Sequence, residues 1–473
     1  MGKPTGFLEY QRIQERKRPV HERVKDYKEV SLEIPLEDLK EQGARCMDCG
    51  IPFCHSFGCP LGNLIPEWND AVYSGQWQEA YYRLEQTNNF PEITGRICPA
   101  PCEASCTLSI NDAPVAIKQL ERSIAEKAFD RGWVMPQHPK KETGNKIAVI
   151  GSGPAGLSAA QQLRRAGHSV TVFERSDKAG GILRYGIPDF KLEKRIIDRR
   201  IHQIKAEGVI FETGVDIGKD ISASYMKKKF DVILLAGGAG KARGLAVPGD
   251  GYEGIHFAME YLTRSNKFTA GEISRDEIIN ARGKKVLVIG GGDTGSDCVG
   301  TARRQGAEKI YQFEILPKPR EWKEAHNPDW PFWPGILRTS TSHEEGCERD
   351  WGIETVRFSG RGVKIEKAYF QRIIWKQYEG KYRKEIAENK DFSLDIDLVF
   401  IAAGFVHTEH SDLHRDLGIE YDQRGNISVD DRYSTNVEGV FAAGDTHTGA
   451  SLVVRAVSHG REAALAVNEY LCS

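Results

Sequence analysis

A strand, a glycine-rich turn and a helical stretch follow one another at two places in this chain of 473 residues, and this arrangement constrains the fold more than any other feature. Residues 146–150 read KIAVI, a short buried-strand pattern, and residues 151–156 read GSGPAG. The same construction recurs as KVLVI at 285–289 and GGGDTG at 290–295. Glycines at this spacing permit a tight turn, close approach of the backbone to a pyrophosphate and close helix packing. The two units predict two dinucleotide-binding folds of the α/β class.

The first unit is predicted to hold a nucleotide at the start of its helix, where unpaired N–H groups and the positive helix end face the phosphates. The residues expected there are Gly151, Gly153, Pro154, Ala155 and Gly156. A second strand at 169–173 ends at Glu174, whose carboxylate can accept from a ribose hydroxyl. A plain turn is the alternative for the glycine motif alone, but the strand before it and the acid after it favour a nucleotide site.

The far end of the chain indicates which nucleotide this is. Residues 436–445 read NVEGVFAAGD, a strand that runs into Gly444 and Asp445 and is followed by a helical stretch with Gly460, Arg461 and Ala464. The segment resembles the second FAD fingerprint of flavoproteins with two dinucleotide domains, in which the Asp holds the ribityl chain. A surface Gly-Asp turn is the alternative. FAD is therefore predicted in the first site.

The second unit is predicted to bind a nicotinamide coenzyme through Gly290, Gly292, Asp293, Thr294 and Gly295. It lies between the two FAD fingerprints, the order found in flavin disulfide reductases and adrenodoxin reductase. Strand-to-glycine segments at 230–238 and 397–404 are either crossings between the domains or ordinary core strands, and 136–145 has the composition of a linker. The predicted domains are 1–140, 146–250 with 405–473 for FAD, and 251–404 for the coenzyme.

Seven of the ten cysteines lie close together in the first quarter of the chain. They are Cys46, Cys49, Cys54, Cys59, Cys98, Cys102 and Cys106. The N-terminus lacks a secretory pattern, so grouped cysteines indicate metal or cluster ligands rather than disulfides. Cysteine followed by proline, as at Cys59 and Cys98, is typical of two-cluster ferredoxins. A pair of 4Fe-4S clusters needs eight ligands in total, and so does a pair of zinc ions. Clusters are favoured because zinc has no redox function beside a flavin.

No cysteine lies between Cys106 and Cys298, so a redox-active disulfide beside the flavin is not expected. The electrons must leave the flavin by another route. FAD can accept a hydride and release electrons singly, which converts nicotinamide chemistry into iron–sulfur chemistry. No general acid–base residue is needed for that transfer, and no catalytic side chain is predicted.

The start MGKPTGF, the seven cysteines, GGILRYGIP at 180–188 and the two later fingerprints together resemble the glutamate synthase small (beta) subunit over essentially the whole chain, a module also found in dihydropyrimidine dehydrogenase. The resemblance implies two Rossmann-like domains, the second inserted in the first, after an α-helical iron–sulfur domain. It also implies that Gly181 and Leu183 belong to the FAD site. One 4Fe-4S cluster would take Cys46, Cys49, Cys54 and Cys106. The other would take Cys59, Cys98, Cys102 and Glu121, for which a solvated helix glutamate is the alternative.

The resemblance further implies that NAD(P)H is oxidised at FAD and that electrons pass through the clusters to a glutamate synthase large (alpha) subunit, which makes L-glutamate from L-glutamine and 2-oxoglutarate. The chain has no room for a substrate barrel or amidotransferase domain and no cysteine at position 2, so glutamine chemistry is expected on that partner. Two alternatives stay open. One is an oxidoreductase that serves ferredoxin or another partner, including electron-bifurcating types, and the other is a binding module with zinc and inactive nucleotide sites.

The coenzyme preference should be set where the strand 309–313 ends, at Glu314, because an acid there accepts from the ribose 2′-hydroxyl of NAD. Many NADPH-linked relatives resemble one another in an arginine pair where Ile315 and Leu316 stand, so NADH is the predicted donor. Four cations could instead turn toward a 2′-phosphate or remain solvated: Arg303, Arg304, Lys318 and Arg320.

The formal net charge of −2, from 65 basic and 67 acidic residues, provides no basic surface for nucleic acid. No apolar stretch is long enough for a membrane helix, and a cytoplasmic protein is expected. The stretch 317–334, with Trp322, Trp330 and Trp333, is predicted to be a packed surface loop. The weaker hypothesis is that it covers the coenzyme or meets the large subunit.

Overall fold

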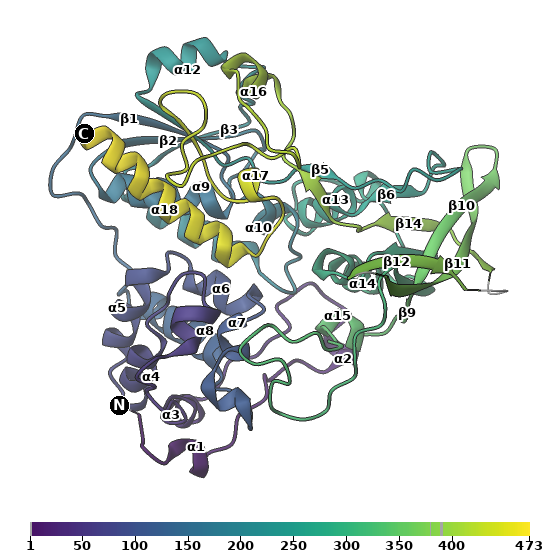
Figure 1. Ribbon diagram of the computed structural model, residues 1–473, viewed down its shortest axis with the longest axis horizontal. Helices are drawn as coiled ribbons and strands as arrows, with labels where there is room; N and C mark the ends of the chain where they lie inside the picture. Colours follow the sequence, from purple (N-terminus) through teal and green to yellow (C-terminus); the bar gives the residue numbers. More distant parts are fainter. Residues whose placement is uncertain (1, 379, 388–390) are drawn as a thin grey trace.

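The computed structural model describes residues 2–378, 380–387 and 391–473, so Met1 of the MGKPTGF segment lies outside the described residues. Three regions are visible in Figure 1: N-terminal helices, a first parallel sheet covered by helices, and a second parallel sheet extended by antiparallel strands. Residues 131–145, between the first two regions, contain no helix or strand, as expected of a linker.

The N-terminal region consists of short helices. They are α1 (Gly6–Glu9), α2 (Val20–Arg23), α3 (Leu36–Ala44), the π-helical turn η1 (Cys54–Gly58), α4 (Ile65–Tyr73), α5 (Trp77–Thr87), α6 (Pro91–Ile97), α7 (Pro101–Ala104), the 3-10 turn η2 (Thr107–Ile110) and α8 (Ile117–Asp130). Proline stands in the first turn of α4, α6 and α7, where its missing N–H costs no hydrogen bond. The core gathers Trp68, Tyr81 and Leu120 together with four of the cysteines. The helices thus surround the cysteine-bearing loops.

The first parallel sheet has the order β16-β4-β1-β2-β3. Its chain runs through β1 (Lys146–Ile150), α9 (Pro154–Arg165), β2 (Ser169–Glu174), α10 (Ile182–Tyr185), α11 (Lys194–Ala206), β3 (Ile210–Thr213), α12 (Ala223–Lys229) and β4 (Val232–Leu235), and returns as α16 (Asp412–Leu417), β16 (Val440–Ala442), α17 (Asp445–Thr448) and α18 (Val453–Cys472). The last strand therefore completes a sheet that began about 300 residues earlier. Helix α18 packs along α9 (Figure 1).

The second parallel sheet has the order β6-β14-β7-β8-β9 and is formed by residues between the two parts of the first. Its elements are β6 (Ile255–Phe257), α13 (Ala258–Thr269), the 3-10 turn η3 (Arg275–Glu277), β7 (Lys285–Ile289), α14 (Asp293–Gln305), β8 (Lys309–Glu314), α15 (Thr341–Glu344), β9 (Glu348–Trp351) and β14 (Leu398–Ile401). Two short strands, β5 (Lys241–Ala242) and β15 (Phe405–His407), pair antiparallel where the chain crosses between the sheets. The segments 230–238 and 397–404 are thus both core strands and the approaches to this crossing.

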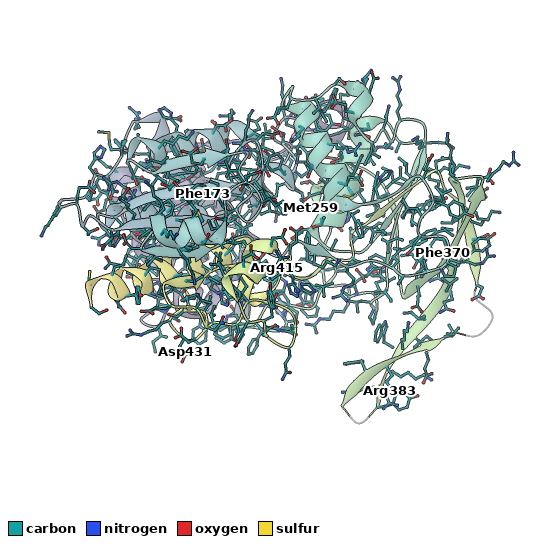
Figure 2. All side chains as sticks on the ribbon, turned by 90° about the horizontal axis from the view of Figure 1, so that it is seen from above. Phe173, Met259, Phe370, Arg383, Arg415 and Asp431 are labelled. Carbon is teal, nitrogen blue, oxygen red and sulfur yellow. The ribbon has the colours of Figure 1, made fainter. Side chains whose placement is uncertain are left out.

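An antiparallel sheet that was not predicted extends the second region. It contains β10 (Ile353–Arg361), β11 (Lys364–Tyr378), β12 (Lys381–Ile386) and β13 (Phe392–Asp395). Phe370 packs in its core, whereas Arg383 lies toward the tip of a projecting ribbon (Figure 2). Among the described residues, no helix is both long and apolar enough to cross a membrane.

Candidate functional site: two nucleotide loops and two cysteine sets

The first glycine loop packs tightly except at one position. Gly151 has φ +106°, and a Cβ there would lie 2.4 Å from the Ala236 oxygen. A Cβ on Gly156 would lie 2.0 Å from the Gly151 oxygen. Gly153, the N-cap of α9, has nothing within 4 Å of a Cβ position, and Pro154 begins the helix. The loop therefore leaves open space where the helix N-terminus could meet a phosphate.

Glu174 at the end of β2 is oriented by the same loop. One carboxylate oxygen accepts from the backbone N–H and the hydroxyl of Ser152, and the other accepts from the Ser176 N–H at 2.8 Å. The sequence did not identify Ser152 as important. Its position could have predicted this contact, because the second residue of the glycine loop has its N–H directed toward the end of the neighbouring strand.

The C-terminal Gly-Asp segment meets the first glycine loop directly. Gly444 has φ +75°, and a Cβ on it would lie 2.6 Å from the Ala155 Cβ. A Cβ on Gly460 of α18 would lie 2.2 Å from the Ala155 oxygen. Asp445 accepts from the Ser451 hydroxyl at 2.6 Å, and burial raises its pKa. The two predicted FAD segments therefore converge at the start of α9.

Gly181 and Leu183 have different positions relative to the start of α9. Gly181 has φ +51°, and its Cβ position is 2.8 Å from the Gly153 Cα. The Leu183 side chain is fully buried in the core of the first sheet. Gly181 thus borders the open space at Gly153, whereas Leu183 supports the segment from within.

The second glycine loop repeats the geometry of the first. Gly290 has φ +121° and a Cβ position 2.2 Å from the Ala402 oxygen, and a Cβ on Gly295 would lie 2.4 Å from the Gly290 oxygen. Gly292 caps α14 with no atom near its Cβ position. Asp293 is exposed and Thr294 is partly exposed in the first turn of the helix. Glu314, at the end of β8, accepts from the Gly291 N–H at 2.5 Å and from the Leu316 N–H at 3.1 Å.

Three of the four cations considered for a 2′-phosphate are bound to other groups. Arg304 forms a fully buried bidentate pair with Glu345. Arg320 pairs with Asp329 at 2.5 Å, and Lys318 with Glu321 at 2.6 Å. Arg303 is exposed on α14. Because Arg304 is paired with Glu345, it is not available to a 2′-phosphate, and its position in the sequence did not indicate this pairing.

Four of the grouped cysteines line one cavity, and the other three lie near Glu121. One cavity is lined by Cys46, Cys49, Cys54 and Cys106, here called the first set. Burial raises the pKa of Cys46 to about 11 and also raises that of Cys54, and in both cases the other charged groups that act on the thiol belong to the same set. Buried thiolates are unstable without a cation, so these side chains suit a metal cluster that would reverse the shift.

Cys59, Cys98, Cys102 and Glu121 form the second set. Burial raises the pKa of Cys59 to about 11 and that of Cys98 to about 12, and the negative charge of Glu121 adds to both shifts. Glu121 also acts on Cys102. Burial thus raises the pKa of thiols in the second set as it does in the first.

Glu121 is buried, so its description as a solvated helix glutamate is wrong. It lies on the inner face of α8 with Leu120 and Ile124 and is 5% exposed. Its Oε1 accepts from Asn88 Nδ2 at 3.0 Å and from the Thr94 hydroxyl. Burial raises the pKa of Glu121 to about 8. Asn88 and Thr94 were not predicted, although a Glu within the apolar stripe of α8 is the signal that such partners exist.

Within the described ranges, no three His, Cys, Asp or Glu side chains are close enough to share one metal ion. Tetrahedral zinc would draw its sulfur ligands to about 2.3 Å from a single centre. A four-iron cluster takes one ligand at each iron, so its ligands stand further apart. The described residues thus do not form a site of the single-ion kind.

The tryptophan-rich segment lies on the iron–sulfur region rather than over the glycine loop. The indole N–H of Trp330 donates to the oxygens of Ser105 and Cys106, and the Asn327 side chain donates to the Ala104 oxygen. In Figure 1 the green chain before α15 reaches the helices around α7. The segment is packed, as predicted, and its contacts include a cysteine of the first set.

Two family models match the chain. Residues 145–460 match the pyridine nucleotide-disulphide oxidoreductase model, and residues 23–133 match dihydropyrimidine dehydrogenase domain II, 4Fe-4S cluster. FprA from Mycobacterium tuberculosis has the same fold, with a TM-score of 0.55 at 15% identity over 70% of this chain and 85% of its own. The fold and the site thus define a nucleotide-dependent oxidoreductase of this class with an N-terminal 4Fe-4S domain.

Curated relatives specify the family further. The chain is 52% identical to the glutamate synthase [NADPH] small chain of M. tuberculosis, over 100% of this chain and 96% of that one. It is 46% identical to the small chain of Bacillus subtilis over 100% and 99%. The Schizosaccharomyces pombe glutamate synthase [NADH] is 44% identical over 98% of this chain, which matches only 22% of that longer protein. The chain belongs to the glutamate synthase small chain family.

Proposed function

We propose that this chain oxidises NADH at FAD and delivers electrons, through two 4Fe-4S clusters, to a glutamate synthase large subunit that forms L-glutamate from L-glutamine and 2-oxoglutarate. The observation that carries the proposal is that one chain combines two sets of buried or partly buried candidate ligands with two open glycine loops. The proposed domains are residues 1–140 for the clusters, 146–250 with 405–473 for FAD, and 251–404 for the coenzyme.

FAD, when bound, supplies the conversion between a two-electron and a one-electron donor. The chain would hold its pyrophosphate at Gly153 and Pro154, where the helix start is open, and its adenosine ribose at Glu174. Asp445 would hold the ribityl chain. The coenzyme would occupy the equivalent positions at Gly292, Thr294 and Glu314. In this arrangement the protein binds and orients, and no side chain has to move a proton.

The two ligand sets have different neighbours in the rest of the chain. Ser458 of α18 donates to the oxygen of Pro60, next to Cys59, at 2.9 Å. Ile97, next to Cys98, packs against the core of the first sheet. The second set therefore borders the flavin domain, and the first set borders the tryptophan-rich segment. This supports an electron route from FAD to the second set, then to the first set, and then to the partner.

The fused relative supports a large partner. In S. pombe the region similar to this chain occupies about a fifth of the protein named glutamate synthase [NADH]. The remaining length there can supply a glutamate-forming part. Some relatives are named for NADPH and others for NADH, so their names do not decide which coenzyme this chain uses. The carboxylate of Glu314 favours NADH.

Reconstitution tests the proposal. The chain, purified without oxygen, should contain one FAD and about eight iron atoms, as two four-iron clusters require. It should reduce ferricyanide with NADH, and it should form glutamate only when it is mixed with a large subunit. Iron near four per chain would contradict the two-cluster proposal. Ferricyanide reduction without glutamate formation would favour a different electron acceptor, such as ferredoxin.

A further inference from the structure

We propose that Trp330 is a positioning residue for the first 4Fe-4S cluster, through which a segment of the coenzyme domain fixes the loop that carries Cys106. The inference rests on the proposed function only in assuming that the first set holds a cluster. It assigns a role to the tryptophan-rich segment, which neither the nucleotide loops nor the ligand sets require.

The segment binds the cysteine-bearing loop through four backbone carbonyls. Trp330 Nε1 donates to the Ser105 oxygen at 3.2 Å and to the Cys106 oxygen at 3.1 Å. Asn327 donates from its side chain to the Ala104 oxygen at 2.8 Å and from its backbone to the Ser109 oxygen at 2.7 Å. In return, the Ser105 hydroxyl donates to the Pro331 oxygen at 2.8 Å.

Two of these carbonyls, those of Ala104 and Ser105, lie at the end of α7, which is short and ends at Ala104. The last carbonyls of a helix have no partner within the helix, and they need one from elsewhere when protein covers them. Here a segment more than 200 residues away in the sequence supplies the donors. The loop after α7 thus takes its conformation from the coenzyme domain.

Aromatic contacts add a second attachment, to the loop that carries Cys54. The ring centroids of Phe53 and Trp330 are 4.8 Å apart, and those of Phe57 and Phe332 are 5.4 Å apart in an edge-to-face arrangement. Cys54 lies between the two phenylalanines, in η1. The segment therefore contacts the chain next to two ligands of the first set, Cys54 and Cys106.

A positioning element must itself be held, and the chain just beyond the tryptophan-rich segment, at Ser340 and His343, is bound to the coenzyme loop. The Ser340 hydroxyl lies 2.6 Å from that of Ser296 in the first turn of α14. His343 accepts from the Ser340 N–H, so its other nitrogen donates to Gln312 Oε1 at 2.7 Å. Gln312 in turn donates to the Gly290 oxygen at 2.9 Å. The segment 327–343 therefore spans from the first set to the coenzyme loop.

Potentials of iron–sulfur clusters depend on hydrogen bonding near the ligands and on solvent exposure. Loss of the indole removes one donor from the Ser105 and Cys106 carbonyls, although the Cys106 carbonyl keeps the Ser109 N–H, and it should let water come nearer the cluster. Water stabilises the more negatively charged reduced cluster, so the potential of the first cluster should rise. The second cluster borders the flavin region and should keep its potential.

Three variants of the anaerobically purified full chain test the assignment. Trp330→Phe keeps the ring against Phe53 and removes only the N–H donor. Trp330→Ala removes both. Trp322→Ala is the matched control, because the Trp322 indole donates only within its own segment, to the His326 oxygen at 3.0 Å.

We expect a raised potential and an altered electron paramagnetic resonance signal for one cluster in Trp330→Ala and a smaller change in Trp330→Phe. Amide hydrogen exchange at residues 104–110 should quicken in the same order. Reduction of FAD by NADH and the signal of the second cluster should match the wild type, as should every property of Trp322→Ala.

Unchanged potential, signal and exchange in Trp330→Ala would overturn the inference, as would equal effects on both clusters. If Trp330→Ala does not fold, Trp330→Phe still decides between the outcomes. A wild-type protein with no first cluster would instead contradict the proposed function, which separates the two failures.

Discussion

The carboxylate of Glu314 accepts a hydrogen bond from the backbone N–H of Gly291 at 2.5 Å, which places a negative charge at the point where the second glycine loop meets the end of β8. Glu174 and Ser152 form the same contact in the first loop. The repeated contact orients each acid at the end of its strand, where we propose that a ribose binds.

Replacement of Glu314 by Ala should therefore reduce the preference for NADH. A hydrogen bond to a charged group is worth about 1.5–3 kcal/mol, so kcat/KM for NADH should fall about 10- to 100-fold. The value for NADPH should rise, because the repulsion of its 2′-phosphate is removed. Ferricyanide as acceptor avoids the need for the partner.

The control is Glu308→Ala, an exposed acid just before the opposite end of β8. A native preference for NADPH, with no change of the ratio in Glu314→Ala, would show that this carboxylate does not read the ribose.

Glu121→Ala should remove one cluster and leave the other. The second set would keep only three cysteines, so iron should fall from about eight to about four per chain. The flavin content should not change, because Glu174 and Asp445 lie in another region. Asp130→Ala, at the exposed end of the same helix, should keep both clusters. Retention of all the iron in Glu121→Ala would refute its role as a ligand.

Two glycines of the first loop should respond differently to Ala. Gly153 has ordinary backbone angles and free space at its Cβ position, so Gly153→Ala should fold but bind FAD more weakly, because the methyl group occupies space near the expected pyrophosphate. Gly156→Ala would place a methyl group 2.0 Å from the Gly151 oxygen and should impair folding itself. Flavin fluorescence released on denaturation and circular dichroism distinguish the two effects. Full FAD occupancy in Gly153→Ala would argue against a phosphate at this position.

Glu92→Ala should lower stability more than a typical surface change. Glu92 of α6 forms two hydrogen bonds of 2.7 Å with Arg200 of α11, and both side chains are almost wholly buried between the helical region and the first sheet. Removal of one partner from a buried ion pair costs about 3–5 kcal/mol. Urea unfolding followed by tryptophan fluorescence measures this loss.

Glu79→Ala provides the comparison, because its pair with Arg83 is exposed and should contribute at most about 1 kcal/mol. Equal midpoints for Glu79→Ala and Glu92→Ala would contradict the importance of the buried pair.

The sequence by itself determined the local chemistry of this protein. Glycine spacing predicted both nucleotide loops, because only glycine accommodates the positive φ of Gly151 and Gly290 and the close approach at Gly156 and Gly295. Alternation of strands and helices predicted the two parallel sheets, and clustering of the cysteines predicted the iron–sulfur region. These features depend on neighbours in the chain, so spacing alone records them.

Only the tertiary structure decided which distant groups meet. It buried Glu121 beside Asn88 and Thr94, bound Arg304 to Glu345, and brought Trp330 onto the loop of Cys106. It also built the antiparallel sheet that extends the region of the second parallel sheet. Buried charges and carbonyls need hydrogen-bond partners, and the packing of distant segments decides which partner each one meets. The periodicity of a single sequence does not encode the identity of that partner.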